Sequence, residues 1–198
     1  MILFLTKSKK HPGSASGQTR GAAFRLNLHF TTDKKLMTKI LFVCHGNICR
    51  SPMAEFIMKK LVRERGLERG FVIASAATSR EELGNPVYPP ARRILAQHGI
   101  GCSGKTAVQM TKADYDKYDF ILAMDNMNLR NIMRIIRSDP QGKVSLLLDF
   151  APDPRPVADP WYTGDFETAY RDIEEGCMAF LNQIRAEELW VMSYEFTG

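Results

Sequence analysis

Cys44 and Arg50 stand six residues apart in the segment Cys44-His-Gly-Asn-Ile-Cys-Arg-Ser51. A cysteine thiolate is a strong nucleophile. The planar guanidinium of arginine can hold two phosphate oxygens at once, whereas lysine offers only a point charge. In a tight loop between them, backbone N–H groups would turn toward one point and form a nest for a tetrahedral anion. The segment therefore predicts a loop that binds phosphate and attacks it through Cys44.

The elements on either side of this loop would hold it at the edge of a sheet. Residues 39–43 form a short, largely apolar run typical of a buried strand in a parallel sheet, which places Cys44 at the strand's carboxyl end. Ser51 is the predicted N-cap of the following helix, and Pro52 its first residue. Apolar residues then recur at helical spacing until Gly66 ends the helix. The N-terminus of that helix would face the same anion.

Residues inside the loop fit this chemistry. Gly46 and Asn47 suit the positive φ angles that a tight anion-binding loop needs. The nest would stabilise the thiolate of Cys44, and the Ser51 hydroxyl would hydrogen-bond the sulfur and make it a better leaving group in a second step. Taken alone, a cysteine at the end of a strand is more often a small buried apolar residue. The strand before the loop and the helix after it favour the nucleophile.

The segment from Val43 to Pro52 resembles the signature of the low-molecular-weight protein tyrosine phosphatases. Further matching segments follow in the family's order, and the resemblance runs from about Met37 to Arg185; these segments are Ser75–Thr78, Gly84–Pro86, His98–Ile100, Tyr118–Asp125, Asn128–Arg130 and Asp159–Tyr162. It implies hydrolysis of phosphotyrosine through a phosphocysteine intermediate, with no metal or other cofactor. The residues expected to surround the phosphate are His45, Gly46, Asn47, Ile48, Cys49 and Ser51.

The resemblance also assigns the proton donor to Asp159. Expelling a phenolate requires a general acid, and the second step requires a general base that activates water. Asp159 follows the proline-rich stretch 152–156, which is stiff enough to hold a carboxyl group over the anion site. Without the resemblance, Asp-Pro is simply a common turn or helix-start pair. Trp161 and Tyr162 would form aromatic walls that favour aryl phosphates; many relatives carry two tyrosines here.

Three further residues are assigned by the resemblance. Ser75 and His98 are expected to hydrogen-bond Asn47 and to hold its strained backbone in place. Cys49 lies five residues after Cys44, and such a pair can form a reversible disulfide that protects the nucleophile from overoxidation. The alternative for Cys49 is a small residue in a tight loop, and both possibilities remain open.

Enzymes with other functions also carry a Cys-x5-Arg loop. Thiol-dependent arsenate reductases pass oxidation to downstream cysteines, but the stretch Met124–Arg130 has none. Protein-arginine phosphatases of this fold usually carry threonine at the position of Ile48 and lack the aromatic pair after Asp-Pro. A catalytically silent phosphopeptide-binding module would not need all three chemical groups. We therefore expect a tyrosine phosphatase, with the arginine phosphatase and the arsenate reductase as alternatives.

The fold expected is α/β, a single domain with a four-stranded parallel sheet and helices on both faces, which is the flavodoxin-like architecture of this family. Strands and helices alternate along the chain, which is typical of a doubly wound sheet with its site at the carboxyl ends of the strands. Strands are predicted at 39–43, 71–75, 120–124 and 144–147. Helices are predicted at 52–65, 89–98, 111–116, 126–137 and 165 to about 185.

Charge divides the chain into two parts. Residues 1–36 hold seven Lys and Arg against one Asp, although the 198-residue chain has a net charge of only +5. They are predicted to be an extension that is disordered or that arises from an upstream translation start, with a transit segment as the alternative. Residues 37–198 are predicted to be the phosphatase domain. The remainder is nearly neutral overall, which argues against nucleic acid as a partner.

The remaining expectations concern location and partners. Four cysteines at irregular spacing do not form a secreted disulfide framework, and no apolar run is long enough to cross a membrane. We therefore expect a cytoplasmic enzyme without stable membrane insertion. Its partner would be a phosphotyrosine protein, for which a bacterial tyrosine kinase is one candidate, and the enzyme itself would be a monomer or a weak homodimer.

Overall fold

Helices alternate with strands from Thr38 onward in the computed structural model, which describes residues 37–195. The predicted extension, residues 1–36, lies outside the described residues. The strands are β1 (Thr38–Cys44), β2 (Phe71–Ala77), β3 (Phe120–Ala123) and β4 (Val144–Leu146). The helices are α1 (Arg50–Glu64), α2 (Pro89–Gln97), α3 (Ala113–Lys117), α4 (Asn126–Ile136), α5 (Pro160–Thr163) and α6 (Phe166–Glu195), with 3-10 turns η1 (Glu68–Gly70) and η2 (Leu147–Phe150).

The four strands form one parallel sheet in the order β2-β1-β3-β4. The predicted four-stranded α/β sheet is therefore confirmed, although β2 runs two residues further than expected. The chain crosses to one side of β1 to make β2 and to the other side to make β3. Ligands in such open sheets bind where the strand order reverses, at the carboxyl ends of the strands, and β1 ends there with Cys44.

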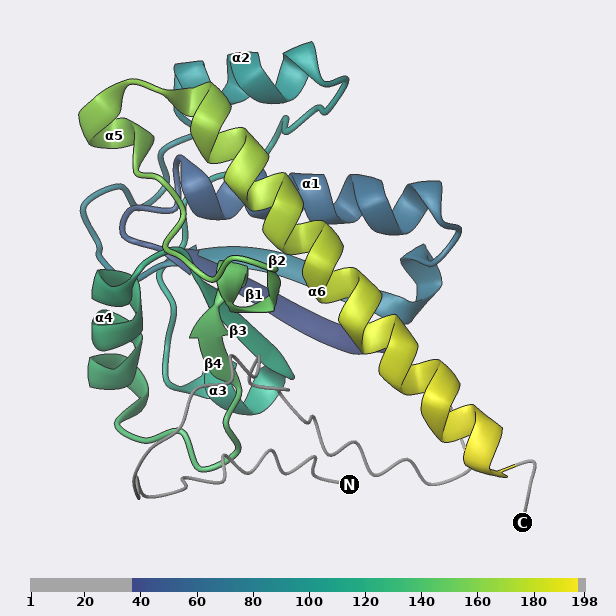
Figure 1. The fold of residues 1–198 in the computed structure, drawn as a ribbon. Helices are drawn as coiled ribbons and strands as arrows, with labels where there is room; N and C mark the ends of the chain where they lie inside the picture. The colour runs from purple at the N-terminus through teal and green to yellow at the C-terminus, as the bar shows by residue number, and fades with distance from the viewer. Residues whose placement is uncertain (1–36, 196–198) are drawn as a thin grey trace, which may run out of the picture.

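Both faces of the sheet are covered by helices (Figure 1). Ile40 and Phe42 of β1 pack in a core that includes α1, α2 and α6, whereas the alternating residues Leu41 and Val43 pack in a second core with α4. A strand that is buried on both faces must be apolar at nearly every position, because successive side chains point to opposite sides. This explains the unbroken apolar run that precedes the loop.

Helix α6 is longer than predicted and crosses the same face of the sheet as α1 (Figure 1). The apolar stripe predicted for it is buried throughout: Phe166, Ala169, Tyr170, Ile173, Cys177, Phe180, Leu181 and Ile184. The predicted end near residue 185 was wrong, because helical backbone continues to Glu195. Within the described part of the chain, no helix is long and apolar enough to span a lipid bilayer.

Gly176 allows α6 to pack closely on η2. A Cβ atom at this buried position would lie 2.6 Å from Cγ of Leu147. We expect Gly176→Ala to lower the free energy of unfolding by about 1–2 kcal/mol, because overpacking outweighs the gain of about 1 kcal/mol that alanine brings to a helix interior. Urea denaturation would measure this change.

Gly101 supplies the matched control for that substitution. It lies outside the helices, and a Cβ atom there would meet nothing within 4 Å. Gly101→Ala should leave the urea midpoint nearly unchanged. Equal midpoints for the two alanine variants would show that the close contact between α6 and η2 does not limit stability.

Candidate active site

The Cys44–Arg50 loop connects β1 directly to α1 at the carboxyl edge of the sheet. Cys44 is the last residue of β1 and Arg50 the first residue of α1, and both are 4% exposed. The prediction that Ser51 is the N-cap was wrong, because the helix begins two residues earlier than predicted, at Arg50 after Cys49. The Ser51 hydroxyl instead lies 3.0 Å from Sγ of Cys44, so it serves the loop rather than the first helical turn.

The sulfur of Cys44 receives polar contacts from within the loop. Besides the Ser51 hydroxyl, the backbone N–H of Asn47 donates to Sγ over 3.3 Å. Polar contacts of this kind suit a sulfur that attacks and later leaves, because donors beside it take the place of the water that burial removes. These contacts fit the predicted nucleophile better than the alternative of an inert buried cysteine.

Asn47 holds the loop in shape. Its φ is 57°, as predicted, and its side chain is buried. The amide nitrogen donates to the hydroxyls of Ser51 and Ser75, each over 2.8 Å, and the amide oxygen accepts from the backbone N–H of Val108. The predicted contact between Ser75 and Asn47 is therefore confirmed.

The prediction that His98 contacts Asn47 was wrong. Both amide hydrogens of Asn47 are already donated to serines, and His98 follows the end of α2, where its ring stacks on Tyr170 with centroids 3.8 Å apart. Gly46 also differs from expectation, because its φ is not positive. A Cβ atom there would lie 3.1 Å from Cγ of Glu82, so a larger residue would have to displace the Glu82 side chain.

A buried charge cluster lies behind Ser75 and was not predicted from the sequence. The Ser75 hydroxyl donates to the carboxylate of Glu55 over 2.6 Å. Glu55, on α1, also pairs with Lys59 and, over 3.2 Å, with Lys105. A chain of hydrogen bonds therefore runs from Glu55 through Ser75 and Asn47 to the hydroxyl beside the sulfur. One feature of the sequence could have suggested this cluster: Glu55 lies one helical turn after Ser51 in the predicted helix.

Arg50 lies between two carboxylates that come from distant parts of the chain. Its guanidinium donates to Asp125 over 2.8 Å and to Asp159 over 2.7 Å. Asp125 was not predicted as a site residue. It caps α4 by accepting from the backbone N–H of Asn128. A carboxylate that follows a neighbouring strand of the sheet could have suggested it, because strand ends meet at one edge.

Asp159 is positioned by the start of a short helix. It is the N-cap of α5, where one carboxylate oxygen accepts from the backbone N–H of Trp161 over 3.1 Å and the other faces Arg50. The preceding proline-rich stretch is attached to α6, since Arg155 pairs with Asp172 and Glu175, each over 2.7 Å. This attachment holds the loop that carries Asp159 in place.

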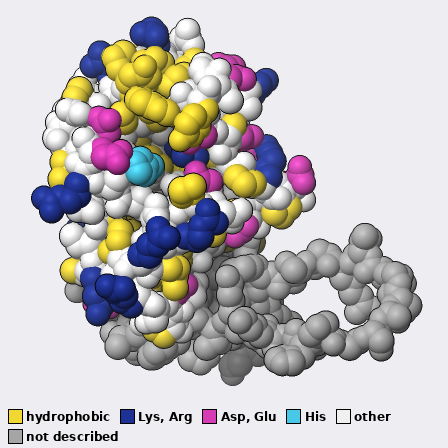
Figure 2. Space-filling view, turned by 90° about the vertical axis from the view of Figure 1, so that its left-hand side faces the viewer, with side chains coloured by type: hydrophobic (Ala, Val, Ile, Leu, Met, Phe, Trp, Pro, Cys, Tyr) yellow, Lys and Arg dark blue, Asp and Glu magenta, His cyan; other side chains and the backbone are white. Residues whose placement is uncertain are grey.

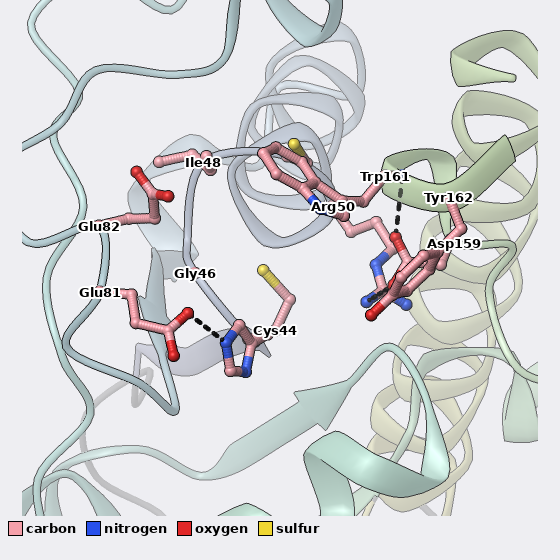
Figure 3. A pocket seen from close by; sticks show the side chains of 11 residues that line it. Cys44, Gly46, Ile48, Arg50, Glu81, Glu82, Asp159, Trp161 and Tyr162 are labelled. Atoms are coloured by element: carbon pink, nitrogen blue, oxygen red, sulfur yellow. Dashed lines mark hydrogen bonds and ion pairs between the residues drawn. The ribbon is translucent and has the colours of Figure 1, made fainter. Parts of the chain in front are cut away.

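The loop, the capping aspartate and two aromatic side chains enclose a cavity of about 230 Å³. Its lining residues come from three segments: Cys44, His45, Gly46, Ile48, Cys49, Arg50, Glu81, Glu82, Asp159, Trp161 and Tyr162. Figure 3 shows Asp159, Trp161 and Tyr162 on the side opposite Glu81 and Glu82. The side chains of Asn47 and Ser51, predicted to bind phosphate, do not line the cavity but support the loop from behind.

The aromatic wall rests on a tyrosine that sequence reasoning missed. Trp161 is 56% exposed and Tyr162 is 85% exposed, so neither is a buried anchor for the last helix. The Trp161 ring packs on Tyr88 with centroids 5.4 Å apart, and Tyr88 in turn packs on Phe166. Trp161 is therefore held at the rim with much of its surface free to contact a ligand.

Cys49 lies in the cavity as a free thiol, as does Cys44. Burial raises the pKa of Cys49 to about 12, and the neighbouring Cys44 adds to the effect. Cys49 therefore stays protonated near neutral pH, which makes it a poor nucleophile. The regulatory disulfide between the two cysteines stays a prediction. Among the described residues, no group of His, Cys, Asp and Glu side chains is arranged to hold a metal ion.

Comparisons with known proteins agree on one family. Residues 39–189 match the family model described as low molecular weight phosphotyrosine protein phosphatase. The chain is 38% identical over 154 residues to low molecular weight protein-tyrosine-phosphatase YfkJ of Bacillus subtilis, covering 77% of this chain and 99% of that protein. It is 40% identical over 149 residues to the human low molecular weight phosphotyrosine protein phosphatase, covering 73% of this chain and 94% of the human protein.

Solved structures lead to the same conclusion. The crystal structure of YfkJ superposes with a TM-score of 0.73 at 38% identity, covering 76% of this chain and 96% of that one. The low molecular weight protein tyrosine phosphatase SP-PTP of Streptococcus pyogenes gives a TM-score of 0.67 at 38% identity, covering 74% of this chain and 93% of that chain. The chain belongs to the low molecular weight phosphotyrosine protein phosphatase family.

Proposed function

We propose that this chain hydrolyses phosphotyrosine, and aryl phosphate monoesters generally, through a phosphocysteine intermediate on Cys44. The observation that carries the proposal is the convergence of Cys44, Arg50 and Asp159 in one cavity, although Asp159 lies 109 residues after Arg50 in the sequence. A nucleophile, a cation for the phosphoryl oxygens and a proton donor are the three groups that this reaction needs.

Binding would begin with an exchange of partners at Arg50. Its guanidinium now contacts Asp125 and Asp159, which hold the fork in place beside Cys44. A phosphate dianion in the loop would take over the contact that Asp159 makes, while Asp125 continues to orient the arginine.

The first step would transfer the phosphoryl group to sulfur. The thiolate of Cys44 attacks phosphorus, the bond between phosphorus and the phenolic oxygen breaks, and Asp159 gives its proton to that oxygen. Arg50 and the loop N–H groups hold the three remaining oxygens as their charge increases. The product of this step is phosphocysteine and a free phenol.

The second step would release phosphate. Asp159, now a carboxylate, takes a proton from a water molecule whose oxygen attacks phosphorus, and the bond between sulfur and phosphorus breaks. The leaving thiolate accepts hydrogen bonds from Ser51 and from the backbone N–H of Asn47, which already lie 3.0 and 3.3 Å from the sulfur. These donors make the sulfur a better leaving group.

Trp161 and Tyr162 support a preference for aromatic substrates. A phenyl ring that leads away from the loop would lie between these exposed rings and the opposite wall. The proposed macromolecular substrate is a phosphotyrosine protein, such as a bacterial tyrosine kinase. We place the reaction in the cytoplasm, where reducing conditions keep a nucleophilic thiol free.

A panel of phosphopeptides tests the proposal. Peptides of one sequence carrying phosphotyrosine, phosphoserine or phosphoarginine would be compared by kcat/KM. We expect phosphotyrosine to exceed phosphoserine at least about 100-fold, because the short serine side chain loses the aromatic contacts and has a poorer leaving group. A preference for phosphoarginine would favour an arginine phosphatase, and thiol-dependent reduction of arsenate without phosphatase activity would favour a reductase.

A further inference from the structure

Two glutamates form the wall of the cavity that faces the aromatic side chains. Glu81 and Glu82 follow β2, and neither has a part in the proposed phosphoryl transfer. In Figure 3 they lie across the cavity from Asp159, Trp161 and Tyr162. Figure 2 shows the same face, with acidic side chains beside the exposed histidine and a hydrophobic patch next to them. The mouth of the cavity therefore has negative charge on one side and apolar surface next to it.

Both carboxylates are held in position, although Glu81 is exposed and Glu82 is only partly buried. Glu81 lies 2.9 Å from Nε2 of His45, and its side chain is 71% exposed. Glu82 accepts from the side-chain amide of Asn85 over 2.7 Å, and its aliphatic part lies against Gly46. These contacts keep two negative charges at the mouth of the cavity.

Negative charge at this place works against the proposed substrate. Arg50 is the only lysine or arginine among the described residues that line the cavity, and it is already paired with Asp125 and Asp159. A phosphate dianion approaching past Glu81 and Glu82 is therefore repelled. A substrate that brings a positive charge of its own would turn this repulsion into attraction.

We propose that Glu81 and Glu82 form a subsite for a lysine or arginine next to the phosphotyrosine of the substrate. The proposal rests on the proposed function. A cavity of about 230 Å³ holds little more than the phosphotyrosyl side chain, so the neighbouring residues of a peptide lie at the mouth. Adjacent Cα atoms are about 3.8 Å apart, which brings a long basic side chain within reach of the two carboxylates.

Matched phosphotyrosine peptides test this subsite with the full chain. Three peptides would differ only in the two residues on either side of phosphotyrosine, which are lysine, glutamine or glutamate. We expect kcat/KM for the lysine peptide to exceed that for the glutamate peptide about tenfold at low salt, since two exposed charge pairs each contribute a few-fold. Raising the salt concentration to about 0.5 M should shrink this ratio through screening.

Variants connect the preference to the two residues. In the double variant E81Q/E82Q the ratio between the lysine and glutamate peptides should fall to about two, because only distant charges remain. Glu68→Gln is the control: Glu68 is exposed, lies beyond the opposite end of α1 and does not line the cavity, so the tenfold ratio should persist.

The outcomes separate this inference from the proposed function. Equal rates for the lysine and glutamate peptides in the unaltered chain, or a preference that survives in E81Q/E82Q, would overturn the subsite. Absence of turnover with every phosphotyrosine peptide and with p-nitrophenyl phosphate would overturn the proposed function itself.

Discussion

Cys44→Ser is expected to lower the turnover of p-nitrophenyl phosphate at least about 10⁴-fold, because a serine hydroxyl at neutral pH is a far weaker nucleophile than a thiolate. Among the described residues that line the cavity, no other group is placed to take over its role. The Cys49 thiol also lines the cavity, but its raised pKa of about 12 keeps it protonated. Steady-state release of p-nitrophenol measures the loss.

Binding of phosphate should survive the same substitution. The backbone N–H groups of the loop and the guanidinium of Arg50 are unchanged in the variant, and calorimetric titration with inorganic phosphate would detect them. Cys102→Ala is the matched control, because Cys102 is buried outside the cavity and its loss should leave turnover within about twofold. Activity of Cys44→Ser within tenfold of the unaltered chain would refute the phosphocysteine mechanism.

Asp159→Asn is expected to slow phenyl phosphate about 10²- to 10³-fold, because the amide has no acidic proton to give to the phenolate. Asparagine is preferable to alanine here. It keeps the N-cap of α5, which Asp159 now supplies, and asparagine caps helices about as well as aspartate. A substrate with a good leaving group, such as 2,4-dinitrophenyl phosphate, should lose less than about tenfold, since its phenolate leaves without protonation.

Asp125→Asn separates proton donation from the placement of Arg50. Asp125 contacts the same guanidinium as Asp159 but does not line the cavity. Its variant should therefore slow the two substrates by a similar factor, whatever the leaving group. If Asp159→Asn also slowed both substrates equally, Asp159 would act only by positioning Arg50, and the general acid would have to be sought elsewhere.

The ion pairs of Arg50 explain why both aspartates matter. A guanidinium buried with a single carboxylate would lose its partner when substrate displaces that carboxylate, and an unpaired buried charge is costly. With two carboxylates, Asp125 keeps its contact while Asp159 is released for proton transfer. The site can thus exchange a protein partner for phosphate without leaving Arg50 unpaired.

The proposed acidic subsite and the chemical site use the same loop in different ways. His45, which follows the nucleophile, makes a hydrogen bond with the carboxylate of Glu81 through its ring Nε2 over 2.9 Å. Gly46 provides the space that the side chain of Glu82 occupies. In the proposed function the loop would bind phosphate with its backbone, while the side chains around it would shape the mouth of the cavity.

Local sequence patterns were sufficient for the sheet and for the main chemical groups. An apolar run must be a buried strand when both of its faces are covered, and the end of that strand fixes the place of Cys44. Helix α5 was not predicted, although the proline after Asp159 and the glycine after Thr163 are residues that favour a short capped helix. The stripe on α6 was readable because helical periodicity repeats within one segment.

Errors arose where a side chain had two possible partners. Ser51 resembled an N-cap by its position before proline, yet the sulfur of Cys44 and the amide of Asn47 compete for its hydroxyl and hold it. His98 was expected beside Asn47, but the aromatic face of Tyr170 lies closer. A sequence pattern indicates only the partners that lie nearby in the chain. It could not reveal the partners that other helices and strands bring to the same side chain.

The sequence by itself determined the fold class and predicted the Cys44–Arg50 loop, because each depends on residues close together in the chain, whereas Asp159 was assigned through the family resemblance. Only the tertiary structure decided which distant groups complete the site. Asp125, the Glu55 cluster and the wall made by Glu81 and Glu82 meet the loop at the carboxyl edge of the sheet. Parallel strands bring their ends together whatever their separation in sequence, and that convergence is set by the packing of the whole sheet.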